Sequence, residues 1–148
     1  MRSIGLAGVY AGLAASLLAS APLRAAEPDW RAANSAYDKA RDAAAKGKPK
    51  LDYALCAGNW AAWDDALYDG KVADTTVAAL DNDLSIDGAD EKVNLWRLWL
   101  GNDDRSLDAF DMHREAAGGK IDEALKGDRD ALSGIMDTLG ECQLPKDK

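Results

Sequence analysis

The stretch Tyr53-Ala-Leu-Cys-Ala-Gly-Asn-Trp-Ala-Ala-Trp-Asp-Asp-Ala-Leu67 decides the fold prediction. At helical period, one face of this stretch collects Tyr53, Cys56, Trp60, Trp63 and Leu67. That face holds one of the two cysteines and two of the five tryptophans. A helix so heavily apolar on one side needs other helices to cover it. The stretch therefore predicts a helix inside a bundle.

The rest of the chain shows further helical patterns and no convincing period-two strand. Helices are expected over 28–46, 53–68, 72–80, 89–101, 105–117 and a last segment over 121–142, kinked at Gly127. The helix over 89–101 is apolar over a wide surface and is expected to be central and mostly buried. Gly47 and the pair Gly118-Gly119 are expected to end their helices. The predicted fold class is an all-α bundle of five or six helices.

The first 26 residues have the form of a secretory signal peptide. Arg2 precedes an uncharged, mostly Ala, Leu and Gly run from Ile4 to about Ser20, and small residues follow it. Cleavage is expected between residues 21 and 26. The alternative is an uncleaved membrane anchor, although the run is short for a span. Residues 27–148 then form a single helical domain, periplasmic or secreted, with no stable membrane insertion once the signal is removed.

The charge of the chain is strongly acidic. The sequence has 18 basic and 26 acidic residues. Because Arg2 and Arg24 would leave with the signal, 16 basic and 26 acidic residues remain, a net charge of −10. Such a surface repels nucleic acid and anionic lipid and attracts a cationic protein. The alternative is that the charge only keeps an exported protein soluble.

Export decides how the two cysteines are interpreted. Cys56 and Cys142 both belong to the expected exported part. In an oxidising compartment an even count predicts one disulfide between them. A bridge between residues so far apart stabilises the fold by about 4–5 kcal/mol on the chain-entropy model.

The segment Asp81–Glu91 resembles the beginning of a calcium-binding loop. Asp81, Asp83, Ser85 and Asp87 are candidate metal ligands, and Gly88 stands where such a loop turns sharply. The pattern then fails, because Asn94 occupies the position of the bidentate Glu. The alternative is an acidic turn that leads into a helix N-terminus.

Four tryptophans form two pairs at helical spacing. Trp60, Trp63, Trp96 and Trp99 either line an aromatic pocket for a ligand or partner, or fill the core of an alanine-rich bundle.

Catalytic patterns are not visible in the sequence. There is one histidine, no Cys-x-x-Cys pair and no serine in a nucleophile-elbow context. We therefore expect a non-enzymatic exported binding module with no cofactor and no catalytic residues, which binds a cationic protein through its acidic surface. The alternative is a small-ligand or calcium-binding protein that uses the segment 81–91 or the tryptophans.

Overall fold

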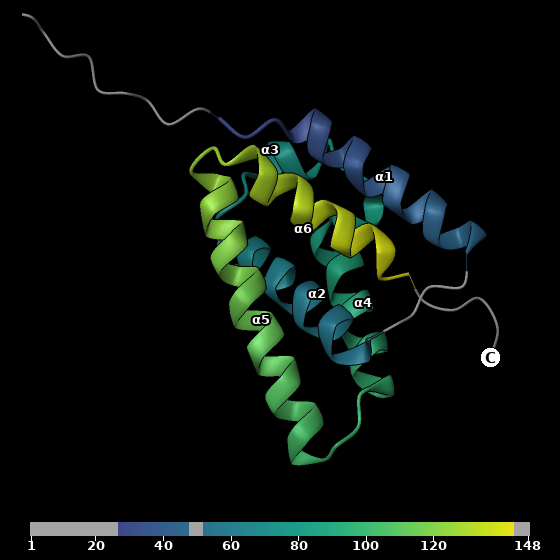
Figure 1. Ribbon diagram of the computed structural model, residues 1–148. Helices are drawn as coiled ribbons and strands as arrows, with labels where there is room; N and C mark the ends of the chain where they lie inside the picture. The colour runs from purple at the N-terminus through teal and green to yellow at the C-terminus, as the bar shows by residue number, and fades with distance from the viewer. Residues whose placement is uncertain (1–26, 48–51, 144–148) are drawn as a thin grey trace, which may run out of the picture.

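The computed structural model describes residues 27–47 and 52–143, and within these residues the fold is all α-helical (Figure 1). The elements in chain order are α1 (Trp30–Lys46), α2 (Tyr53–Tyr68), α3 (Asp74–Val77), the 3₁₀ turn η1 (Asn82–Leu84), α4 (Ile86–Trp99), α5 (Asp104–Leu125) and α6 (Arg129–Glu141). The predicted fold class is confirmed. The expected signal peptide, residues 1–26, lies outside the described residues.

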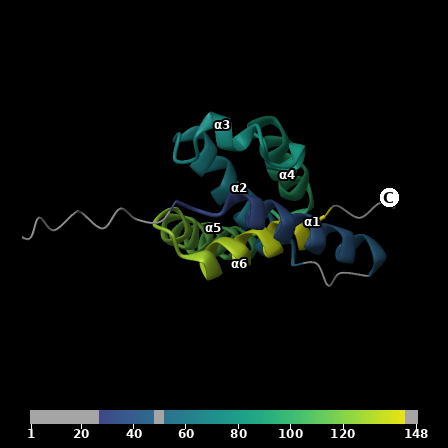
Figure 2. The same cartoon turned by 90° about the horizontal axis from the view of Figure 1, so that it is seen from above.

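Helix α2 is the centre of the bundle, and 11 of its 16 residues are buried. α4 packs on one side of α2, and α5 and α6 pack against other parts of its surface (Figure 2). α1 packs against α6 at the edge of the bundle (Figure 1). Gly58 explains the close contact of α2 with α5, because a Cβ atom there would lie 2.9 Å from the carbonyl oxygen of Phe110. The expectation that α4 is central is wrong, because its Leu98 side is open to solvent, with that residue 79% exposed.

The five long helices share one kind of N-terminal cap. Asp29, Asp52, Ser85, Asp103 and Asp128 each accept a hydrogen bond from a backbone N–H of the first turn. Such caps satisfy donors that have no partner inside the helix and are worth about 1 kcal/mol each. Part of the acidity of the chain is therefore structural.

Helix α5 corrects two expected boundaries. It runs through Gly118-Gly119 to Leu125, although the glycine pair is predicted to end it. The buried side chains of Ala117 and Ile121 hold this part of the helix against its neighbours, and tertiary packing outweighs the low helix propensity of glycine. The chain breaks at Gly127 instead, where the backbone φ is +100°. The predicted kink at Gly127 is thus a full separation of α5 from α6.

Two expectations between α2 and α4 are also wrong. The helix predicted over 72–80 shrinks to one turn, α3, and the residues on either side of it, 71–73 and 78–80, are not helical. The predicted loop over 81–91 is mostly helical, since α4 begins at Ile86 and not near Ala89. Gly88 lies in the first turn of α4, where its lack of a side chain allows α4 to pack closely against η1. A Cβ atom at this position would come within 2.7 Å of the Asp83 carbonyl oxygen.

Candidate functional site

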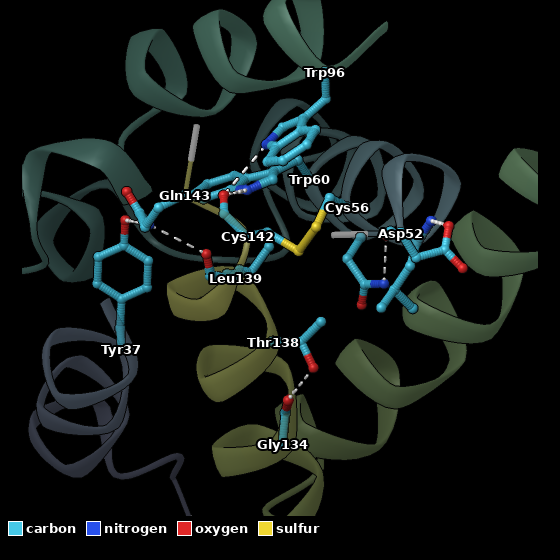
Figure 3. The surroundings of a disulfide bond; sticks show 12 residues. Tyr37, Asp52, Cys56, Trp60, Trp96, Gly134, Thr138, Leu139, Cys142 and Gln143 are labelled. Carbon is cyan, nitrogen blue, oxygen red and sulfur yellow. Dashed lines mark hydrogen bonds between the residues drawn. A yellow bond between two sulfur atoms is a disulfide. The ribbon is translucent and has the colours of Figure 1, made fainter. Parts of the chain in front are cut away.

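The disulfide joins the start of α2 to the end of α6, as predicted. The sulfur atoms of Cys56 and Cys142 lie 2.03 Å apart, and both residues are buried. The carbonyl oxygen of Cys142 accepts hydrogen bonds from the indole N–H groups of Trp60, at 3.2 Å, and Trp96, at 3.3 Å (Figure 3). Cys142 at the end of α6 is therefore joined to α2 by the disulfide and by the hydrogen bond from Trp60, and to α4 by the hydrogen bond from Trp96.

Three of the four candidate tryptophans fill the core. Trp60, Trp63 and Trp96 have almost no exposed surface, and Trp63 donates its indole N–H to the carbonyl oxygen of Leu84 at 3.1 Å. Buried rings with satisfied N–H groups are packing elements. Trp99 is half-buried, and its ring centroid lies 5.9 Å from that of the exposed Tyr53. The four rings therefore do not line one open pocket, and the alternative of core packing describes the first three.

The predicted metal ligands Asp81 and Asp83 lie close together but are paired with cations. The carboxylate of Asp81 forms an ion pair with Arg41 of α1 and accepts the backbone N–H of Asp83. Burial alone would raise the pKa of Asp81, but that N–H and the Arg41 guanidinium hold it below its usual range. The carboxylate of Asp83 lies 3.3 Å from the Nζ of Lys92.

The other two predicted ligands do not join them. The hydroxyl of Ser85 caps α4 by accepting the N–H of Gly88, and Asp87 is exposed on the first turn of that helix. Within residues 27–47 and 52–143, no three His, Cys, Asp or Glu side chains are grouped so that they could hold a metal ion. The geometry therefore gives no support to the calcium hypothesis.

A polar network around Tyr37 connects α1 to the end of α6 (Figure 3). The buried Tyr37 hydroxyl donates to Asp83 at 2.8 Å and accepts from the Nε2 of Gln143 at 3.2 Å. Lys92 donates to the Oε1 of Gln143 at 3.3 Å. Burial, and then the hydrogen bond to Asp83, raise the pKa of Tyr37 far above its usual value. The phenol therefore stays protonated, and the network is a structural latch between α1 and the end of α6.

The solvent-facing side of α5 carries an acidic stripe formed by Asp104, Asp108, Asp111 and Glu115. Their spacing of four, three and four residues places them on one face over about three turns. All four residues are exposed, and none forms an ion pair with another described residue. The exposed Met112 lies beside them, so the surface combines negative charge with an apolar contact point.

A cleft of about 360 Å³ opens between α2 and α5 near this stripe. Its lining residues are Ala62, Asp65, Ala66, Asp69, Lys71, Arg114, Gly118 and Ile121. At the edge, the Arg114 guanidinium donates two hydrogen bonds of 2.7 Å to the Asp65 carboxylate, and Lys71 pairs with Asp122 at 2.9 Å. The pKa of Arg114 is raised, chiefly by the hydrogen bond to Asp65.

Asp64 of α2 has an unsatisfied carboxylate oxygen. Its Oδ1 atom is buried and has no hydrogen-bond partner among the described residues. Burial raises the pKa of Asp64 to about 6, and the charges of Asp90 and Asp65 add to the shift. A carboxylate in such a position destabilises the fold when it is charged.

Comparisons of the chain with models of protein families, with curated proteins and with solved structures find no match.

Sequence reasoning missed the acidic stripe, the cleft and the Tyr37 latch. The stripe had a readable signal, because the carboxylates from Asp104 to Glu115 repeat at helical spacing. The cleft had none, since it depends on how closely α2 and α5 pack.

Proposed function

We propose that this chain is an exported, non-catalytic binding protein that uses the outer face of α5 to bind a cationic protein segment. The observation that carries the proposal is the acidic stripe. Its carboxylates face solvent and none of them forms an ion pair with another described residue, unlike Asp81, Asp83 and Asp65. Unpaired surface charges of one sign attract an oppositely charged partner and speed its association.

The composition of the face supports a protein partner over a simple counterion. Leu107 and Met112 flank the stripe and are 40% and 57% exposed. Exposed apolar side chains beside charges are typical of surfaces that contact amphipathic segments. The stripe spans about 17 Å at the rise of an α-helix, which matches a short basic segment.

The disulfide supports the exported part of the proposal, and the hydrogen bonds of Tyr37 support the non-catalytic part. The Cys56–Cys142 bridge is of the kind that forms in oxidising compartments. Among residues 27–47 and 52–143, none of the helices has the length and apolar character needed to cross a membrane. The buried hydroxyl of Tyr37 is occupied in internal hydrogen bonds.

The test is the binding of a defined cationic probe, fluorescein-labelled octalysine, followed by fluorescence anisotropy at low ionic strength. The triple variant Asp108→Asn, Asp111→Asn, Glu115→Gln removes charge from the stripe, and we expect it to weaken binding about tenfold.

The matched control removes the same number of charges elsewhere, by Asp42→Asn, Asp137→Asn and Glu141→Gln. These residues are exposed on α1 and α6. We expect the control to weaken binding by no more than about twofold. Equal losses in the two variants would show that only net charge matters and would refute the proposal, as would no binding by the unaltered chain.

A further inference from the structure

We propose that the groove between α3 and the start of α4 receives an apolar side chain carried on a basic protein segment. The groove has a volume of about 410 Å³, which falls in the range of ligand-sized clefts. α3 and α4 lie on the side of α2 away from α5 (Figure 2). A partner bound in the groove would therefore not touch the acidic stripe, and this surface is additional to the proposed function.

Apolar side chains form the inner part of the groove. Val77 and Leu80 are half-buried and pack on the hydrophobic core, and Ile86 at the start of α4 is 36% exposed. These three side chains give the groove an apolar surface that continues into the core. Covering this surface with an apolar side chain of a partner removes both from water, which favours binding.

The charges that line the groove are all of one sign. The carboxylates of Asp74, Asp81 and Asp87 line it, and no described residue of the lining is Lys, Arg or His. Asp81 is neutralised by its ion pair with Arg41. Asp74 and Asp87 are exposed and form no ion pair with another described residue. Both stand in the first turn of a helix, which favours negative charge there, and together they attract basic side chains and repel anions.

The connection between α3 and α4 is fixed by hydrogen bonds before any partner binds. The side-chain oxygen of Asn34 in α1 accepts the backbone N–H of Asp81 at 2.6 Å. The Ser85 hydroxyl donates to the carbonyl oxygen of Asn82 at 2.6 Å. Binding in a groove that is already formed costs less conformational entropy than binding that must order a loop.

The exposure of the lining favours a protein segment over a free small molecule. Asp74, Ala78, Asn82, Ile86 and Asp87 all line the groove and are exposed. A free ligand in so open a groove would keep much of its surface in water, whereas ligand pockets usually bury most of their ligand. A segment can place one apolar side chain in the groove and bring its neighbouring basic residues to Asp74 and Asp87.

The test compares two fluorescein-labelled pentapeptides by fluorescence anisotropy at low ionic strength. One peptide has a phenylalanine between two pairs of lysines, and the other has serine in place of the phenylalanine. We expect the phenylalanine peptide to bind the unaltered chain about tenfold more tightly. Equal binding of the two peptides would overturn the proposal, and so would binding of free phenethylammonium as tight as that of the phenylalanine peptide.

The variant Ile86→Ser tests whether the phenylalanine binds in the groove. Leu98→Ser is the matched control, because Leu98 is exposed on the same helix and does not line the groove. We expect Ile86→Ser to reduce the advantage of the phenylalanine peptide from about tenfold to about twofold, and Leu98→Ser to leave it unchanged. An advantage that survives Ile86→Ser, or that both variants reduce equally, would overturn the proposal.

The double variant Asp74→Asn, Asp87→Asn tests the charges and decides the question if Ile86→Ser fails to fold. We expect it to weaken binding of the phenylalanine peptide about fivefold, and the exposed control pair Asp42→Asn, Asp137→Asn to weaken it by no more than about twofold. Equal losses would overturn the proposal. The triple variant of the acidic stripe should keep the full advantage of phenylalanine over serine. Loss of that advantage in the stripe variant would place the phenylalanine on α5 and overturn the groove as its site.

Discussion

The substitution Asp64→Asn should stabilise the protein at neutral and alkaline pH. The Oδ1 atom of Asp64 is buried and has no hydrogen-bond partner among the described residues. Burial and the nearby charges of Asp90 and Asp65 raise the pKa of Asp64 from 3.8 to about 6. Asparagine has almost the same shape and no charge, so it removes the cost of burying the ionised form.

The direction and the size of this change in the free energy of unfolding follow from proton linkage. Because the pKa of Asp64 is higher in the folded protein than in the unfolded chain, the folded state binds more protons between about pH 4 and pH 6. Stability therefore falls as the pH rises through this window. The full shift corresponds to about 3 kcal/mol, and solvent screening of this partly exposed group reduces the expected effect to about 1–2 kcal/mol.

Urea unfolding followed by tryptophan fluorescence measures this effect. Asp64→Asn should raise the free energy of unfolding by about 1–2 kcal/mol at about pH 8 and change it little at about pH 4. Asp137→Asn, on an exposed position of α6, is the control and should show no such pH dependence. A loss of stability at about pH 8, or the same change at both pH values, would refute the reasoning.

Three further predictions concern the fold and the metal hypothesis. Gly140→Ala should lower the free energy of unfolding by about 1–3 kcal/mol, because its Cβ atom would lie 2.5 Å from the backbone oxygen of Tyr37 and push α1 from α6; Gly134→Ala, in open space, should instead raise it by about 0.5–1 kcal/mol, and equal effects would contradict the packing. Replacing Cys56 and Cys142 by serine should cost up to about 4–5 kcal/mol in urea unfolding, and a loss below about 1 kcal/mol would count against the bridge as a main source of stability. The thermal midpoint should be the same in calcium and in chelator, because the carboxylates of Asp81 and Asp83 are already paired; a rise in calcium would contradict this.

Local patterns in the sequence predicted much of the fold. The helical spacing of 53–67 located α2, although Tyr53 is exposed and the helix is buried around most of its circumference and not on one face. The disulfide pairing followed from two cysteines and an expected oxidising compartment. The stripe of Leu132, Ile135, Met136 and Leu139 on α6 is buried as its periodicity predicts. These features depend on neighbours along one helix, which a sequence displays directly.

Features that depend on contacts between helices were not predictable. The pair Gly118-Gly119 predicts a helix end from the sequence. In the structure α5 continues through it, because the neighbouring side chains of Ala117 and Ile121 are packed in the core. Gly88 reads as a sharp turn in a calcium loop, whereas its function is to let η1 approach α4. The partners of Tyr37 are 46 and 106 residues away in sequence, beyond the reach of any local pattern.

The central claim is that a cationic segment binds along the outer face of α5. A titration of the ¹⁵N-labelled, disulfide-bonded chain with octalysine, followed by amide chemical shifts, tests it most directly. We predict that the largest shifts fall on α5 between Asp104 and Glu115. Shifts spread evenly over all acidic surfaces, or concentrated on α1 or α4, would contradict it.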